Sequence, residues 1–337
     1  MKAAFYKQNG EPAEVLKYGD VADLPAPGPS EVSVRVLKRM VHPLDHLLIR
    51  GILPTPIPPG GAIPGHDGMG IVEQVGSDVS TASGIVRGAR VLLFQVHGTW
   101  AERIVAPAAA VFPIPEDVSD HAACQVVING VTAVVLLRAA AAADDQAGLS
   151  TPLLVTAAGS SVGRNVIALA RMRGQKVVAA VRRDAGAEIL SSSFAGLKVV
   201  STEREGWQSA VAAAFGQAPV VALDPTGGDM TTQFLGLLAN RGTLLVYGGL
   251  DPRPSMISTI AVTARGLTIK GVDGFNWATN TSAQQRAADI TEIFEMTRQT
   301  PQNFADYREF PLSDAVRAVS EPATGPRRGA TLLVSPR

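Results

Sequence analysis

The stretch LLVTAAGSSVG, residues 153–163, indicates a short strand, a tight turn and the start of a helix that runs to Arg173. A strand ending in such a turn places the first helical N–H groups, and the positive end of the helix, against a pyrophosphate. The turn must be small because the phosphates approach the backbone closely. Gly163 would let the helix sit tightly on the strand. The small residues of the turn are Ala157, Ala158, Gly159, Ser160 and Ser161.

The end of the next strand indicates which dinucleotide is bound. The stretch does not satisfy the full G-x-G-x-x-G pattern, so an ordinary strand-to-helix turn remains an alternative for the turn alone. The dinucleotide pattern expects an acid about 20 residues past the glycine turn, on the ribose 2′-hydroxyl of NAD. Here Val177–Val181 is followed by Arg182 and Arg183. Because a guanidinium pairs with a 2′-phosphate and a carboxylate repels one, we expect NADPH as the cofactor, although Asp184 follows directly.

Strands and helices alternate around this turn. Predicted strands at 176–181, 220–223, 243–246 and 267–270 are separated by predicted helices at 162–173, 208–215 and 231–239. This alternation predicts an α/β fold with a parallel sheet covered on both faces. An apolar, Ala-rich helix is expected over 130–143, and another over 283–300. Two further glycine-rich strand ends, DPTGG (224–228) and YGG (247–249), would lie along the same sheet edge.

The first third of the chain has a different pattern. Short strands are expected at 32–37, 70–75, 90–94 and 103–105, separated by Gly and Pro. Many short strands with frequent turns predict a barrel-like or sandwich-like β domain. The Pro- and Gly-rich tract at 53–65 is expected to be a loop, and 330–334 a terminal strand.

Composition limits the kind of protein. The 337 residues carry 30 Lys and Arg against 30 Asp and Glu, so no net charge favours nucleic acid or an anionic membrane. A single cysteine, Cys124, excludes an internal disulfide and a cysteine-rich metal site. The N-terminus lacks the apolar run of a signal peptide, and the apolar stretches are short for a membrane span. We therefore expect a cytoplasmic protein without nucleic-acid or membrane partners.

Six segments in order carry a resemblance to a known family: Pro64–Gly76 (PGHDGMGIVEQVG), Arg87–Val91 (RGARV), Gly98–Val105 (GTWAERIV), Asn129–Ala133 (NGVTA), AAGSSVG, and Ala239–Gly249 (ANRGTLLVYGG). On these segments the chain resembles the medium-chain dehydrogenase/reductase superfamily over nearly its whole length, in the zinc-independent branch. Within that branch it is similar to the 2-enoyl thioester reductases and the NADPH quinone reductases.

The resemblance implies a domain plan. A GroES-like β-barrel catalytic domain would comprise residues 1–125 and 276–337, and a Rossmann doubly wound parallel sheet would be inserted at 126–275. It also implies a homodimer and an active site in the cleft between the domains. The cofactor residues implied by the family pattern are Asn129, Thr132, Gly159, Ser160, Ser161, Val162, Gly163, Arg182, Arg183, Tyr247, Gly248, Gly249, Leu250 and, more loosely, Val272–Gly274.

The zinc enzymes of the same superfamily provide a test for metal. Their Cys, His and Cys ligands match His42, His66 and Ile128 here, and Ile128 cannot bind a metal. A catalytic zinc needs three protein ligands, so we expect none. Asp67 or Cys124 completing a site with the two histidines is the alternative.

Without a metal, the implied chemistry is transfer of hydride from NADPH to an electron-poor alkene or quinone, a small electrophilic substrate. The enoyl reductases carry a tyrosine that helps to place or protonate the substrate, and Leu53 stands at its position. Solvent could supply the proton to a quinone or enone. Candidate proton donors on the stretch expected to line the cleft are His42, Asp45 and His46. Trp100 and Trp277, together with Leu53, are expected to line the substrate pocket.

Two other functions remain open at the level of the sequence. An enoyl thioester reductase would need a basic patch for its phosphorylated substrate, and no Lys/Arg cluster is evident. A non-catalytic NADPH-binding protein is the alternative from a different class, because a fold does not establish turnover.

Overall fold

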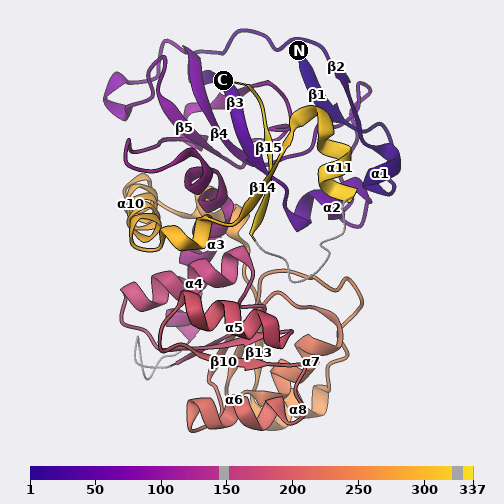
Figure 1. The fold of residues 1–337 in the computed structure, drawn as a ribbon, viewed down its shortest axis with the longest axis vertical. Helices are drawn as coiled ribbons and strands as arrows, with labels where there is room; N and C mark the ends of the chain where they lie inside the picture. Colours follow the sequence, from indigo (N-terminus) through magenta and orange to yellow (C-terminus); the bar gives the residue numbers. More distant parts are fainter. Residues whose placement is uncertain (144–151, 321–328, 337) are drawn as a thin grey trace. The chain divides into compact units, whose positions relative to one another are not determined.

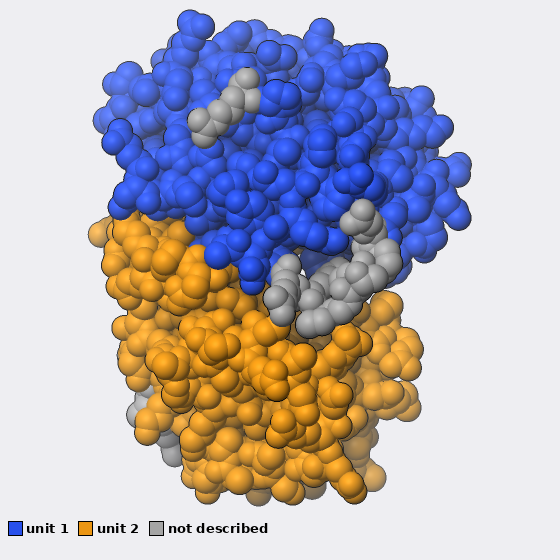
Figure 2. Space-filling model, viewed as in Figure 1, with its two compact units in different colours: residues 1–128, 304–337 blue, residues 129–303 orange. Residues whose placement is uncertain are grey.

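In a computed structural model, residues 1–143, 152–320 and 329–336 are described. The chain divides into two compact units, Met1–Ile128 with Phe304–Arg337, and Asn129–Asn303 (Figure 2). The second unit therefore extends to Asn303, beyond the boundary at residue 275 predicted from the sequence. Helix α10 (Ala283–Gln299) explains the difference, because its Glu292 pairs with Arg173 at 2.7 Å inside the second unit.

The first unit contains a seven-stranded sheet ordered β14-β15-β3-β4-β5-β7, with β6 also pairing with β3, and a two-stranded sheet β1-β2 (Figure 1). The last strand, β15, pairs antiparallel with β3, so both ends of the chain build this unit, as predicted. Its elements are β1 Lys2–Phe5, α1 Pro12–Val15, β2 Lys17–Asp20, β3 Glu31–Met40, α2 Pro43–Ile49, β4 Asp67–Val75, β5 Arg90–Phe94, β6 Arg103–Pro107, β7 Val111–Pro113, β14 Tyr307–Pro311, α11 Ala315–Ser320 and β15 Ala330–Val334.

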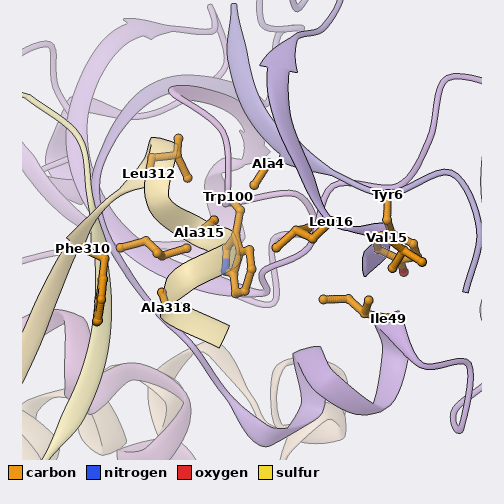
Figure 3. Close-up of a cluster of buried hydrophobic side chains, with 11 residues drawn as sticks. Ala4, Tyr6, Val15, Leu16, Ile49, Trp100, Phe310, Leu312, Ala315 and Ala318 are labelled. Carbon is orange, nitrogen blue, oxygen red and sulfur yellow. The ribbon is translucent and has the colours of Figure 1, made fainter. Parts of the chain in front are cut away.

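Alternation of side chains along β3 builds the core of this unit. Val32, Val34 and Val36 are each 0% exposed and pack in one cluster with residues of β4 and β5. Strand side chains alternate between faces, so the polar residues between these valines point away from the core. A second cluster joins β1, α1 and α11 around Trp100 (Figure 3).

Arg39 lies inside the first unit with no exposed surface. Its guanidinium donates to the Thr99 carbonyl at 3.0 Å, the Ala101 carbonyl at 2.5 Å and the Ser335 hydroxyl at 2.9 Å. Burial lowers the pKa of Arg39 to about 10. Since Thr99 and Ala101 precede β6 and Ser335 follows β15, one side chain links three segments that are distant in the sequence.

The second unit contains six parallel strands in the order β10-β9-β8-β11-β12-β13. The strand order reverses between β8 and β11, and right-handed crossovers then place α4 and α5 on one face and α7 and α8 on the other. The elements are β8 Leu153–Val155, α4 Ser161–Met172, β9 Val177–Val181, α5 Asp184–Ser193, β10 Lys198–Ser201, α6 Trp207–Phe215, β11 Val221–Asp224, α7 Gly228–Leu237, β12 Thr243–Val246, α8 Thr259–Arg265, β13 Thr268–Gly271, α9 Trp277–Asn280 and α10. Together, the two units confirm the predicted fold class, a Rossmann sheet with a GroES-like β domain.

Helix α3 (Asp120–Ala143) begins ten residues before the predicted start at Gly130. The added residues include Val126, Val127 and Ile128, whose branched side chains lower helix propensity. All ten added residues are buried or half-buried, and this burial offsets that cost. By length and hydropathy α3 could also cross a membrane, but 56% of its most apolar window is buried in the protein, as in the core helix of a soluble protein.

We predict that Arg39→Met lowers the free energy of unfolding of the protein by about 2–4 kcal/mol, because the Thr99 and Ala101 carbonyls lose a charged donor and remain buried. Denaturant unfolding followed by tryptophan fluorescence measures the change. Arg35→Met is the control: its ion pair with Glu73 is partly exposed, and we expect a loss below about 1 kcal/mol. Equal losses in the two variants would contradict the structural role of Arg39.

Candidate functional site

The turn after β8 is held in a strained, tight conformation. Ala157 has φ +45°, in the left-handed region that a side chain disfavours. The Ser160 N–H donates to the Ala157 carbonyl at 2.9 Å, and the Ala158 N–H donates to the Ala180 carbonyl of β9 at 3.0 Å. Ser160 then caps α4, since its Oγ accepts from the Gly163 N–H at 3.1 Å. The turn therefore presents the N-terminus of a twelve-residue helix at the carboxyl edge of the sheet.

Two glycines of this turn differ in the space around them. A Cβ on Gly163 would lie 2.8 Å from the Ala158 Cα and 2.9 Å from the Ala157 carbonyl oxygen. On Gly159 it would meet only Val181, at 4.0 Å. Gly163 thus allows the helix to approach the strand end, as the sequence predicted, and the small residues beside it leave room for a pyrophosphate at the helix N-terminus.

Five charged groups gather at the ends of β9 and β10. Arg182 and Arg183 follow β9 and are exposed, and Arg183 stands at the N-cap of α5. Arg204 Nε donates to Asp184 Oδ1 at 2.8 Å and lowers the pKa of Asp184. The Asp184 N–H donates to the carboxylate of Glu203 at 3.0 Å. Arg204 thus balances one of the two acids, and Arg182 and Arg183 remain exposed cations that fit a 2′-phosphate.

The loop that follows β12 is hydrogen-bonded to the loop that follows the neighbouring strand β11. The hydroxyl of Tyr247 is buried, and burial, together with the charge of Asp224, raises the pKa of Tyr247 well above its usual value. Gly248, Gly249 and Leu250 follow as an exposed loop, and the Leu250 N–H donates to the Pro225 carbonyl at 2.9 Å. The structure thus brings the predicted residues of β8 and β12 to one edge of the sheet, with β11 between them.

Asn129 and Thr132 lie on α3. Asn129 is buried, and Thr132 is half-buried. Gly274 approaches Thr132 so closely that a Cβ on Gly274 would lie 2.9 Å from the Thr132 Oγ1. The loosely predicted segment 272–274 and Thr132 are therefore neighbours, and the roles of both at the cofactor stay predictions.

Two of the candidate proton donors, His42 and Asp45, lie in a buried cluster of histidines and aspartates in the first unit. His42 Nε2 lies 2.9 Å from Asp67 Oδ2, and both residues are less than a tenth exposed. Burial opposes the charge on His42, but the charge and hydrogen bond of Asp67, with the charge of Asp45, more than offset it, so the pKa of His42 is raised. His46 is half-buried on α2.

Each carboxylate oxygen of Asp45 accepts a hydrogen bond from the backbone. One oxygen accepts from the His42 N–H at 2.7 Å and the other from the Gly65 N–H at 3.2 Å, and His66 Nδ1 lies 3.6 Å from it. His42 and Asp45 form a capping box that starts α2. Asp45 thus fixes the α2 turn against the Gly65 loop, which is a structural role.

The described residues do not fit a catalytic zinc. Among them, no three His, Cys, Asp or Glu side chains come together in an arrangement that could hold a metal ion. The Nε2 atom of His42 is hydrogen-bonded to Asp67. Burial raises the pKa of Cys124 well above its usual value, which disfavours the thiolate that would bind zinc. Cys124 and Asp67 therefore do not complete the site considered from the sequence.

The predicted pocket residues lie in different environments. Leu53 is 42% exposed in the loop after α2. Trp100 is 0% exposed and packs in the cluster of β1, α1 and α11 (Figure 3). Trp277 is 2% exposed, and its Nε1–H donates to Asp289 at 2.6 Å. Trp100 and Trp277 are therefore packed inside the protein in this structure, and the pocket-lining roles of these residues and Leu53 stay predictions.

The chain was compared with known proteins. Residues 28–116 match the family model of the alcohol dehydrogenase GroES-like domain, and residues 161–290 match that of the zinc-binding dehydrogenases. These two domains in this order, on this fold, decide the family. The chain belongs to the medium-chain dehydrogenase/reductase superfamily.

Relatives of two kinds are similar to the chain. The mitochondrial enoyl-[acyl-carrier-protein] reductase of Bos taurus is 26% identical over 98% of this chain and 89% of its own length, and that of Mus musculus 28% over 95% and 84%. Among solved structures, a putative NADPH:quinone reductase from Bacillus thuringiensis is 27% identical, with a TM-score of 0.85 over 99% of this chain and 98% of its own. The Escherichia coli quinone oxidoreductase complexed with NADPH shares the fold, with a TM-score of 0.80 at 21% identity over 99% of this chain and all of its own.

We predict that Gly163→Ala destabilises the protein by about 1–3 kcal/mol and weakens NADPH binding, since the new Cβ must push α4 away from the turn. Because Ala has a higher helix propensity than Gly, a net loss of stability in this variant would come from the clash of the new Cβ. Gly236→Ala, in α7, where a Cβ would meet nothing within 4 Å, is the matched control: it should not destabilise the protein and should leave NADPH binding unchanged. Thermal unfolding and titration calorimetry measure the two effects, and a Gly163→Ala variant as stable as wild type would show that the helix tolerates displacement.

Proposed function

We propose that the protein is an NADPH-dependent reductase that transfers hydride to a quinone or an α,β-unsaturated carbonyl compound without zinc. The observation that carries this proposal is the pair Arg182 and Arg183 at the end of β9, beside the small-residue turn of β8. Asp184 is paired with Arg204 at 2.8 Å, and Glu203 accepts from the Asp184 N–H at 3.0 Å, so Arg182 and Arg183 are exposed cations that favour a phosphate on the ribose. The superfamily, the NADPH complex of one structural neighbour and the quinone reductase function of others support the same assignment.

The chain contributes binding and orientation. NADPH, when bound, supplies a hydride to the electron-poor carbon of the substrate. The N-terminus of α4 and the hydroxyls of Ser160 and Ser161 would bind the pyrophosphate, and Arg182 and Arg183 the 2′-phosphate. Asn129, Thr132 and the loop 247–250 would position the nicotinamide end. Fixing the two reactants in one geometry is the main catalytic contribution that such a site makes.

The proton that follows the hydride comes from solvent or from His42 in this proposal. Asp67 raises the pKa of His42 above its usual value, so the protonated form of this histidine, which can donate a proton, is favoured in the first unit. The carboxylate of Asp45 accepts hydrogen bonds that hold α2 to the Gly65 loop, so Asp45 is not the proton donor. His46 remains a second candidate. Leu53, exposed where the enoyl reductases carry tyrosine, suits an apolar substrate that needs no phenolic donor.

The alternative within the same class is reduction of a 2-enoyl thioester. The curated relatives named above are enoyl-[acyl-carrier-protein] reductases, which favours it. Leu53 disfavours it, because the phenol of those enzymes is absent. A non-catalytic NADPH-binding protein is the second alternative. The cytoplasmic location expected from the sequence stays a prediction, since those relatives are mitochondrial.

We also propose that the protein is a homodimer formed along β13. This strand is the edge of its sheet, and all four of its residues are exposed. Strands of parallel sheets are normally covered, and an open edge is a template for pairing. Exposed apolar side chains flank it: Met256 is 76%, Ile260 79% and Ile269 39% exposed. A second copy of the chain, related by a two-fold axis, would cover the same edge and the same side chains on both partners.

We expect wild-type protein to oxidise NADPH in preference to NADH with at least one member of a panel of 1,4-quinones, alkenals and crotonyl thioester, equally with and without a chelator. The double variant Arg182→Ala/Arg183→Ala should lower kcat/KM for NADPH by about 10–100-fold, as the loss of charged hydrogen bonds predicts, and leave NADH unchanged. Arg171→Ala, on the last turn of α4, is the control. A preference for NADH would refute the cofactor assignment, and NADPH binding without turnover would favour the non-catalytic alternative.

For the dimer, we expect wild type to elute at twice the mass of the chain in light scattering and Ile260→Glu/Ile269→Lys to elute as a monomer. The introduced charges would have to be buried without partners in the interface. Ile52→Glu makes a comparable change at an exposed residue of the first unit and should leave the mass unchanged. A variant that stays dimeric would place the interface elsewhere.

A further inference from the structure

Asp224, the last residue of β11, is a carboxylate buried to 0% exposure. Oδ1 accepts hydrogen bonds from the Thr156 hydroxyl, from the Thr226 N–H at 3.1 Å and from the Thr226 hydroxyl at 2.7 Å. Oδ2 accepts from the Thr231 hydroxyl at 2.5 Å. All of these partners are neutral. Burying a charge is costly even when it is fully hydrogen-bonded, so a neutral residue at this position would be the simpler way to fill the space.

The partners of Asp224 come from both sides of one crevice. Thr156 begins the turn after β8, whereas Thr226 and Thr231 belong to the loop after β11 and the first turn of α7. β8 and β11 are neighbours, and the order of the sheet reverses between them. Ligands of open α/β sheets bind in the crevice at this point, outside the carboxyl ends of the strands. Asp224 therefore links the two loops that border the crevice.

The link extends to the loop after β12. The Tyr247 N–H donates to the Asp224 carbonyl at 3.1 Å, and the Asp251 N–H donates to the Thr226 carbonyl at 2.8 Å. Gly227 has φ +75° and lies so close to the Asp251 carbonyl oxygen that a Cβ would not fit. Three consecutive strand ends of the sheet are thus held at fixed spacing, with the carboxylate of Asp224 at their centre.

We propose that Asp224 is a positioning residue for the dinucleotide site, acting through Thr156 on the turn that binds the pyrophosphate. This inference rests on the proposed function. Asp224 does not bind the dinucleotide, because its oxygens are occupied by four donors and its charge would repel a phosphate. It holds the β8 turn and the β11 loop at the separation that the pyrophosphate requires, so the site needs no rearrangement when the ligand binds.

Two pairs of variants test the link. Thr156→Val and Thr231→Val keep the shape of the side chain and remove the donor to Asp224, whereas Thr156→Ser and Thr231→Ser keep the donor. Calorimetry with NADPH should show a Kd raised about tenfold or more for each Val variant and little change for each Ser variant, in line with the loss of one hydrogen bond to a charged group. The same variants are titrated with adenosine 2′-monophosphate by ligand-observed NMR. That ligand contacts Arg182 and Arg183 and has no pyrophosphate, so its affinity should not change.

The outcomes separate this inference from a general loss of structure. Val variants that bind NADPH as wild type does would overturn it. Val variants that lose both ligands to the same degree would also overturn it, since the defect would then not be confined to the pyrophosphate turn. Because Thr156 lies deeper than Thr231, the Thr231→Val pair decides the question if Thr156→Val does not fold. Wild type that binds neither ligand would instead overturn the proposed function, and this inference with it.

Discussion

The approach of α4 to the end of β8 is the constraint on which the second unit depends. Only a residue without a side chain fits at Gly163, because the backbone of Ala157 and Ala158 lies within 2.9 Å of where a Cβ would be. That approach brings the helix N-terminus to the sheet edge, and the left-handed Ala157 turns the chain sharply enough to reach it. The neighbouring strand ends then collect around the same point, since parallel strands share one carboxyl edge.

The sequence predicts much of this fold because the predicted strands of the second unit are apolar runs and those of the first are short segments separated by Gly and Pro. Strands 90–94, 243–246 and 330–334 have the bounds expected. Helix α5 and strand β10 were not predicted: α5 contains a glycine and three serines, which have weak helix propensity, and β10 has four residues. Helix α2 was missed although Pro43 at its first position and the capping pair His42 and Asp45 mark its start.

The site was less accessible to sequence reasoning than the fold. Arg182 and Arg183 lie where the strand pattern puts them, because they directly follow a predicted strand. The bond between Thr156 and Asp224 joins residues 68 positions apart, and no local pattern reports it. Arg204, which neutralises Asp184, likewise comes from a different strand end. Trp100 shows the same limit, because aromatic residues serve both packing and binding, and its complete burial could not be predicted from the sequence.

Arg39 has a consequence for the order in which the chain folds. Its guanidinium binds the hydroxyl of Ser335, and β3 pairs with β15, so the first unit lacks two of its closing interactions until the chain up to Ser335 has left the ribosome. The second unit is continuous in sequence and is complete by Asn303. During synthesis, residues 1–128 therefore stay without these interactions while the second unit is made and until strands β14 and β15 follow it. The N-terminal strands are the part most exposed to aggregation in that interval.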